Sequence, residues 1–418
     1  MSGTLLVRGA RQLITLRGSA EPRRGAALAE LGIIRDGALL IEDGRIVQVG
    51  LSRRVENLAL VHRSQEIDAT GRVVMPGFVD CHAHLVVGAA WLDDDEARID
   101  TANEPAHGPV PAIQALRNVS AKRLESRARQ FVNAMIRHGT TALEAKSGYG
   151  LDGRGELKIL RVQARLDRAP LDIASTFLTP RSITASHSND PADYMSWICS
   201  ELLPAIGRRT FARFAGLRCG EQVFNPEQSR RYLEAARALG FQLKIHAGPH
   251  GTHDAVRLGV EMGAASVDRL HDAGPADVEL LARSNTMAVL LPGAAFSHGT
   301  GPCAAARQLI DGGAAVALGT NFNPGATSTY SMPTIVALAC AHFGMSPAEA
   351  ICGATFNAAC AVGSGRVAGS LEVGKPADLI VLNASDYREI PCHFGVNLVN
   401  RTVKRGVTIY QEGRVAPQ

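Results

Sequence analysis

Short apolar runs divide this chain of 418 residues into two β-rich ends and a different middle. At the ends, residues 1–75 and 366–418, the runs are separated by turn-forming residues, as in GALLIEDGRIVQVG and ADLIVLNAS. This is the pattern of strands joined by tight turns, and the DGRI and ATGR stretches fit hairpins. We therefore predict one small composite β-sandwich domain assembled from both termini.

The middle of the chain, residues 76–365, repeats an apolar run followed by a helical stretch. Two of the helical stretches, 118–139 and 225–240, carry apolar residues at helical spacing and end at glycine. Eight such units over about 290 residues match the usual size of a (β/α)8 TIM-like barrel, so the predicted fold class is α/β. The strand candidates are GFVDCHAHL, TTALEAKSG, LDIASTFL, FAGLRCGE, FQLKIHAG, ASVDRLHD, TMAVLLPG and AAVALGTN.

Composition narrows the class of partner. Hydrophobic residues make up 46% and charged residues 20% of the chain, and the formal net charge is only +4 with no long basic block, which predicts no nucleic-acid partner. No apolar run approaches the length of a membrane span, so no membrane is expected. Eight cysteines lie scattered without CxxC spacing, which favours reduced thiols in a cytoplasmic protein.

The candidate chemistry begins in PGFVDCHAH, where His82 and His84 are two residues apart. Side chains at this spacing on a strand share a face, so the pair can offer two nitrogens to one Zn or Fe ion. His246 ends the apolar run FQLKI of a later unit and is a third candidate. A single histidine at a strand end is more often structural, but three at the strand ends of one barrel favour a metal site.

Several longer motifs spread over nearly the whole chain make the interpretation more specific. On these motifs the chain resembles the amidohydrolase superfamily and, within it, the imidazolonepropionase family, whose members hydrolyse 4-imidazolone-5-propanoate. The motifs are PGFVDCHAH (76–84), RHGTTALEAKSGYGLD (137–152), EQSRRYLEAARALGFQLKIHA (227–247), VLLPGAAF (289–296), NFNPG (321–325), GSLEVGKPADLIV (369–381) and FGVNLV (394–399).

The resemblance implies a TIM-like barrel with a small β domain, one divalent metal ion and a small-molecule substrate. His82, His84 and His246 match three metal ligands of the family. Further positions match groups that contact the substrate: Tyr149 in the SGYG turn, and Asn323 with Gly325, which hold its carboxylate side chain. Without the resemblance, Tyr149 would be a packed loop aromatic and 323–325 a simple turn.

Five positions depart from the family pattern. Asn321 occupies the place of an aspartate that is both the fourth ligand and a proton carrier, and Pro249 stands where the family has an acid–base glutamate. Arg269 replaces a histidine near the metal, and Arg181 replaces a substrate-binding histidine. Trp91 stands where an arginine of the family grips the substrate.

These departures make the pocket about three charge units more positive. One positive charge ~4 Å from a bound cation repels it by roughly 4 kcal/mol at an effective dielectric of 20. We therefore expect a weakly bound metal ion, with Asn321 coordinating through its carbonyl oxygen, and an anionic substrate that Arg181 and Arg269 bind. The proton acceptor must also come from elsewhere. His250, one residue past the missing glutamate, is the first candidate, and His271, two residues beyond Arg269, is the second.

Two functions from different classes remain open. The first is a metal-dependent hydrolase of a C–N bond in a small, anionic cyclic amide or amidine, with a homodimer as the expected assembly. The second is a non-catalytic or metal-free anion-binding protein on the same scaffold. Loss of the aspartate and the glutamate favours the second function, whereas the three retained histidines favour the first.

Overall fold

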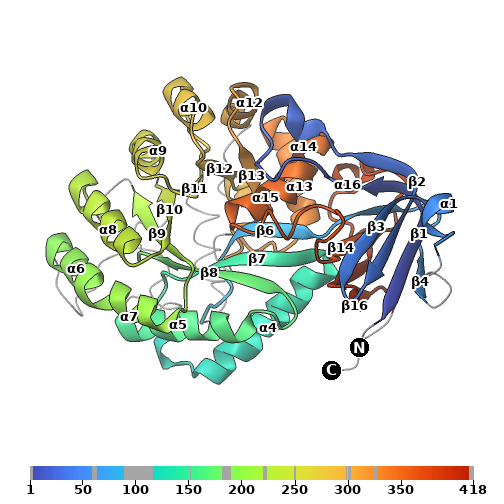
Figure 1. Cartoon of the computed structure of the whole chain (residues 1–418). Coiled ribbons are helices and arrows are strands. Elements are labelled where there is room, and N and C mark those ends of the chain that lie inside the picture. The colour runs from blue at the N-terminus through green and yellow to red at the C-terminus, as the bar shows by residue number, and fades with distance from the viewer. Residues whose placement is uncertain are drawn as a thin grey trace.

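The computed structural model describes residues 3–58, 64–88, 116–150, 152–180, 190–219, 224–248, 251–297, 299, 303–323 and 327–413. Two eight-stranded sheets organise the described chain, one parallel and one mixed. In Figure 1 the parallel sheet lies inside a ring of helices, and the mixed sheet, built from both ends of the chain, lies to one side of it. The α/β barrel with a small composite β domain is therefore confirmed, while the predicted limits at residues 75 and 366 stay a prediction.

The parallel sheet follows chain order from β6 to β13. Each of its strands coincides with one of the eight apolar runs predicted from the sequence, and nearly all of their residues are buried. Strands buried on both faces show no polar alternation, which explains why the runs are continuous. The strands are β6 (Phe78–Ala83), β7 (Thr140–Lys146), β8 (Asp172–Leu178), β9 (Phe214–Cys219), β10 (Gln242–Ala247), β11 (Ser266–Asp268), β12 (Met287–Leu290) and β13 (Val316–Leu318).

Helices connect these strands and cover the outside of the barrel (Figure 1). Local sequence sets their ends: the Ser120 hydroxyl accepts the N–H of Arg123 in the first turn of α4, and Asn225 forms a capping box with Gln228 at the start of α8. The helices in this part are α4 (Ala121–Arg137), α5 (Gly153–Leu166), α6 (Pro191–Trp197), the π-helix η3 (Ile198–Leu202), α7 (Leu203–Arg209), α8 (Pro226–Ala238), α9 (Thr252–Glu261), α10 (Pro275–Ala282), α11 (Pro292–Ser297), α12 (Ala304–Asp311), α13 (Met332–Phe343), α14 (Pro347–Gly353) and α15 (Phe356–Ala361).

The barrel closes through the segment that follows β13. Backbone N–H groups of Asn321 and His84 donate to the carbonyls of His82 and Phe322, at 2.8 and 2.7 Å, and Ala83 forms a parallel bridge with Phe322. The seam of the barrel thus lies directly at the two histidines of the HxH pair. The first and last strands are held in register where the candidate site lies.

The second sheet has the order β16-β15-β14-β5-β1-β2-β3, with β4 also paired to β1. Its strands come from both termini: β1 (Thr4–Ile14), β2 (Ile33–Glu42), β3 (Arg45–Leu51), β4 (Gln65–Asp68), β5 (Val73–Pro76), β14 (Leu379–Leu382), β15 (Val399–Lys404) and β16 (Val407–Gln411). Three short helices accompany them, η1 (Gly25–Ala29), α1 (Ser52–Val55) and α16 (Glu389–Cys392). Within the described ranges, no helix has the length and apolarity that a membrane crossing needs.

The two predicted hairpin turns have different outcomes. Asp43 and Gly44 join β2 to β3 with φ of 50° and 77°, the backbone of a two-residue hairpin turn. The hairpin predicted at ATGR is wrong. The strands on either side, β4 and β5, each pair in parallel with successive parts of β1, so residues 69–72 only connect them.

We predict that Gly44→Ala destabilises the protein more than Gly71→Ala. Both glycines have left-handed φ, 77° and 76°, and strain alone costs about 1–2 kcal/mol for an alanine there. An added Cβ at Gly44 would lie 2.6 Å from the backbone oxygen of Arg405, whereas nothing lies within 4 Å at Gly71. This contact adds roughly 1–3 kcal/mol at Gly44. Equal urea-unfolding midpoints for the two variants would contradict the prediction.

Candidate active site

Three histidines predicted as metal ligands lie together at the carboxyl end of the barrel. His82 lies on β6, His84 directly after it, and His246 on β10. The ring centroid of His82 is 5.7 Å from that of His84 and 5.2 Å from that of His246. The strands β6 and β10 are far apart in sequence and in sheet order, so only closure of the barrel brings these rings together.

The imidazoles have the electronic state that metal binding requires. Nε2 of His82 and Nδ1 of His84 and His246 are buried and have no hydrogen-bond partner among the described residues. Burial, followed by the charge of Lys146, lowers the pKa of His82 to about 4. Burial also lowers the pKa of His84 and His246 well below the ordinary value. Neutral rings with unpartnered nitrogens are the form that binds divalent ions, so the residues present fit a metal.

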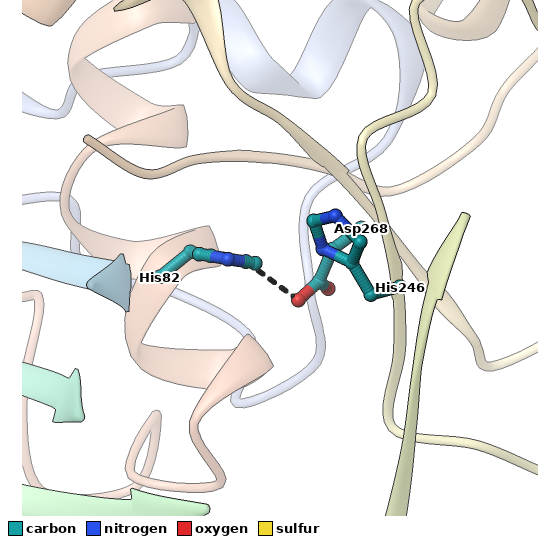
Figure 2. Close-up of side chains that lie close together, drawn as sticks. All are labelled: His82, His246 and Asp268. Carbon is teal, nitrogen blue, oxygen red and sulfur yellow. Dashed lines mark hydrogen bonds and ion pairs between the residues drawn. The ribbon is translucent and has the colours of Figure 1, made fainter. Parts of the chain in front are cut away.

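Asp268, on β11, brings a carboxylate to this group. One atom each of His82, His246 and Asp268 lie within 4.8 Å of one another, and Figure 2 shows the three side chains converging. The dashed line in that figure is the 2.8 Å contact between Nδ1 of His82 and Oδ2 of Asp268. Asp268 was not among the residues predicted from the sequence.

A chain of buried charges continues from Asp268 into the barrel. Lys146 Nζ lies 3.0 Å from Asp268 Oδ2 and 2.6 Å from Glu144 Oε1, and Lys244 Nζ lies 2.7 Å from Glu144 Oε2. Although burial opposes it, the carboxylates of Asp268 and Glu144 raise the pKa of Lys146. Lys146 is therefore a charged residue held between two carboxylates, which does not suit a carboxylated lysine that bridges metal ions.

Asn321 takes part in the site mainly through its backbone. Its N–H donates to His82, and its side-chain Nδ2 donates to Thr327 Oγ1 at 3.3 Å. Because Nδ2 is used in this bond, the side-chain carbonyl oxygen of Asn321 stays available to a cation. Beside it, Thr320 Oγ1 donates to Asp80 Oδ2 at 2.6 Å, and burial raises the pKa of Asp80 to about 6.

Tyr149 and Asn323, predicted to contact substrate, do lie next to the histidines. The Tyr149 ring is 4.9 Å from His84 in an edge-on arrangement, and its hydroxyl bonds to Nδ2 of Asn323. The turn that carries Tyr149 is fixed by the buried carboxylate of Glu156, which accepts the N–H groups of Gly148 and Gly150 at 2.9 and 2.5 Å. Glu156 is a second functional residue that sequence analysis missed.

Two arginines bring positive charge to the same end of the barrel. Arg269 follows β11 with φ of 69°, and its Nη1 is buried without a hydrogen-bond partner among the described residues. Arg218 on β9 pairs in register with His246 on β10. After burial, the charge of Arg218 is the largest contribution that lowers the pKa of His246, and Arg269 contributes as well. Arg269 therefore supports the predicted positive charge of the pocket, and Arg218 adds a second positive group that the sequence did not predict.

The predicted proton acceptor His271 has a less favourable place. Strand β11 ends at Asp268, so Arg269 and His271 do not lie on a strand whose alternation would bring them to one face. Its ring packs edge-on against Phe343 of α13, with centroids 5.7 Å apart. Its role as a base stays a prediction.

The remaining predicted site residues lie outside the described residues, and their roles stay predictions. They are Trp91, Arg181, Pro249, His250 and Gly325.

The parallel barrel and its histidine cluster define a metal-dependent hydrolase of the amidohydrolase class, and residues 65–105 and 219–409 each match an amidohydrolase family. The chain belongs to the imidazolonepropionase family. It is 40% identical to the imidazolonepropionase of Geobacillus kaustophilus, an alignment that covers 98% of this chain and 99% of that protein. It is 38% identical to the imidazolonepropionase of Porphyromonas gingivalis, covering 97% of each.

Solved structures agree on the fold. An adenosine deaminase from Xanthomonas campestris with bound zinc superposes with a TM-score of 0.69 at 18% identity, covering 97% of this chain and 92% of that one. The guanine deaminase of E. coli gives 0.70 at 16% identity, covering 98% and 99%. At these identities the similarity shows the barrel architecture alone.

We predict that Glu156→Gln destabilises the protein by about 1–3 kcal/mol, because a glutamine has one acceptor oxygen and leaves one buried N–H of the Tyr149 turn unpaired. The control is Glu125→Gln on α4, where the partner is a partly exposed arginine at 2.8 Å and the expected change is below about 1 kcal/mol. Urea unfolding of both variants measures the difference. If Glu156→Gln costs no more than the control, Glu156 does not fix the turn.

Proposed function

We propose that the protein hydrolyses a C–N bond in a small, anionic cyclic amide or amidine related to 4-imidazolone-5-propanoate. The observation that carries the proposal is the group of three neutral, buried imidazoles with unpartnered nitrogens at the carboxyl end of the barrel. The name shared by relatives at up to 40% identity supports the substrate class. The changed positions favour a substrate that differs from that of the relatives.

His82, His84 and His246 are the residues that would hold one divalent ion, Zn or Fe, with the carbonyl oxygen of Asn321 as a neutral fourth group. Such an ion polarises the carbon under attack and makes water a better nucleophile. The residues of the chain supply the rest. Tyr149 and Asn323 contact the substrate next to His84, and the closed barrel keeps bulk water away from the buried rings.

Relative to the family pattern, two carboxylates are lost and two arginines are gained around this site, which supports an anionic substrate. The buried Nη1 of Arg269 is a donor that an anion can use, and guanidinium groups bind carboxylates through paired hydrogen bonds. Arg181 is the second predicted partner of the anion. His250 remains the first candidate for the group that accepts a proton from water.

The alternative is a metal-free anion-binding protein. Asn321 supports it, since an amide brings no charge to offset a divalent ion, and so does the accumulation of arginines. Elemental analysis of the purified protein separates the two functions at once. A hydrolase contains a divalent metal ion in a near-stoichiometric amount after reconstitution, whereas the binding protein does not.

We predict at most one metal ion per chain, which a chelator removes readily, and slow hydrolysis of 4-imidazolone-5-propanoate. The expected kcat/KM lies below ~10⁴ M⁻¹ s⁻¹, because the substrate contacts at positions 91 and 181 are altered. Metal analysis before and after dialysis against chelator, with a spectrophotometric assay, measures both. A value in the normal enzyme range would show that the substrate is that of the relatives.

We predict that Asn321→Asp tightens metal binding by at least about tenfold, or 1.4 kcal/mol, because a carboxylate adds charge attraction to coordination. Adding Arg269→His should tighten it further by removing a positive charge and a competing partner for the new carboxylate. Competition with a chelating dye gives the affinities. If neither variant binds metal better than the parent, the three histidines no longer form a metal site and the alternative function is correct.

A further inference from the structure

We propose that Asp268 is a positioning residue, whose carboxylate holds the Nδ1–H of His82 so that Nε2 of this ring carries the lone pair offered to a metal ion. The consequence for metal binding rests on the proposed function, but the orientation of the ring does not. Asp268 is thereby distinguished from a direct ligand, the role that its closeness to His82 and His246 would first suggest.

The hydrogen bonds of Asp268 support this assignment. Its Oδ1 accepts the hydroxyl of Ser266 at 2.6 Å, and its Oδ2 lies 2.8 Å from Nδ1 of His82 and 3.0 Å from Nζ of Lys146. A carboxylate offers about four acceptor positions, and three are in use. An ion bound through Oδ2 would have to displace either the ring of His82 or the ammonium of Lys146.

The charges below the site hold Asp268 in place. Lys146 lies between Asp268 and Glu144, and Glu144 is bound in turn by Lys244 and by the hydroxyl of Thr176 at 2.5 Å. All of these side chains are buried. If Asp268 moved toward an ion, Lys146 would keep only Glu144 as a partner, and the loss of one of two carboxylates beside a buried ammonium is unfavourable.

The remaining contacts of His82 point to the same ring orientation. The backbone N–H of His82 donates to Asp80 Oδ1 at 3.2 Å, and its carbonyl accepts the N–H of Asn321 at 2.8 Å. The main chain is thus fixed on both sides, and Asp268 fixes the ring. Nε2 is then the only ring nitrogen left, and it is buried without a partner among the described residues. A carboxylate behind a histidine ligand sets its tautomer in this way.

The test uses Asp268→Ala, which removes both oxygens. Nothing then holds the Nδ1–H of His82, so its proton is free to move to Nε2, the nitrogen that should bind the ion. Asp268→Asn is the milder variant, because its amide oxygen can stay at the place of Oδ2, where it meets both Lys146 and His82, and it should keep Nδ1–H. We expect ¹⁵N NMR of the metal-free proteins to show Nδ1–H in the parent and in Asp268→Asn but Nε2–H in Asp268→Ala, with His82→Gln identifying the signals. An Asp268→Ala protein that keeps Nδ1–H would overturn the proposal.

Binding of Zn²⁺ alone gives the second readout. In the parent, the Nδ1–H signal of His82 should persist after Zn²⁺ is added, since Asp268 keeps this proton. Asp268→Ala should weaken Zn²⁺ binding at least 10- to 100-fold. Ser266→Ala, which removes one bond of Asp268 but keeps its charge and its bond to His82, should leave the tautomer unchanged and weaken Zn²⁺ binding less than tenfold.

The matched control is Asp378→Ala. Asp378 is a buried carboxylate 2.6 Å from Nζ of Lys404 in the other sheet, so its loss removes a comparable ion pair far from the histidines. It should leave Zn²⁺ affinity unchanged. Nε2–H in the metal-free parent, or loss of the Nδ1 proton on Zn²⁺ binding, would overturn the proposal. A parent with Nδ1–H that binds no Zn²⁺ would instead overturn the proposed function and keep the positioning role.

Discussion

Charges buried in the barrel have to cancel one another, and this constraint sets the geometry of the site above them. Glu144 and Asp268 face Lys146 and Lys244 across distances of 2.6–3.0 Å, so two negative and two positive groups form one neutral set. If any of them turned away, a buried partner would lose an ion pair and the set would no longer be balanced. Asp268 is consequently fixed at one end of the set, and the ring of His82 takes its orientation from it.

Much of the fold could be predicted because it depends on local patterns. Continuous apolar runs identify strands that are buried on both faces, and residues such as Ser120 and Asn225 mark helix starts through hydrogen bonds within four residues. The connection at residues 69–72 could not be predicted in the same way. Its flanking strands have the composition of a hairpin, but their pairing partner is β1, some sixty residues earlier in the chain.

The candidate site was predictable to the extent that its residues form a recognisable motif. The histidine pair and His246 stand at the ends of apolar runs, and Tyr149 and Asn323 belong to motifs shared with a known family. Glu144 and Lys244 lie within two of these motifs but carry no recognisable metal-binding or substrate-binding pattern, and Asp268 lies outside the motifs. They lie on three different strands, and only the closed barrel with its strand register brings them together. A buried lysine or glutamate in an apolar run is the feature that could have drawn attention to them.

Two of the positions that differ from the family share an unusual backbone. Asn321 and Arg269 both have left-handed φ, 53° and 69°, and each is tied to the barrel through its own N–H, to His82 and to Val289. The fold therefore holds these positions mainly through the main chain, and the one side-chain bond of Asn321, from Nδ2 to Thr327 Oγ1, is 3.3 Å long. Substrate and metal preference can drift here under mutation while folding is hardly affected, so this barrel can acquire a new reaction before it has to acquire a new structure.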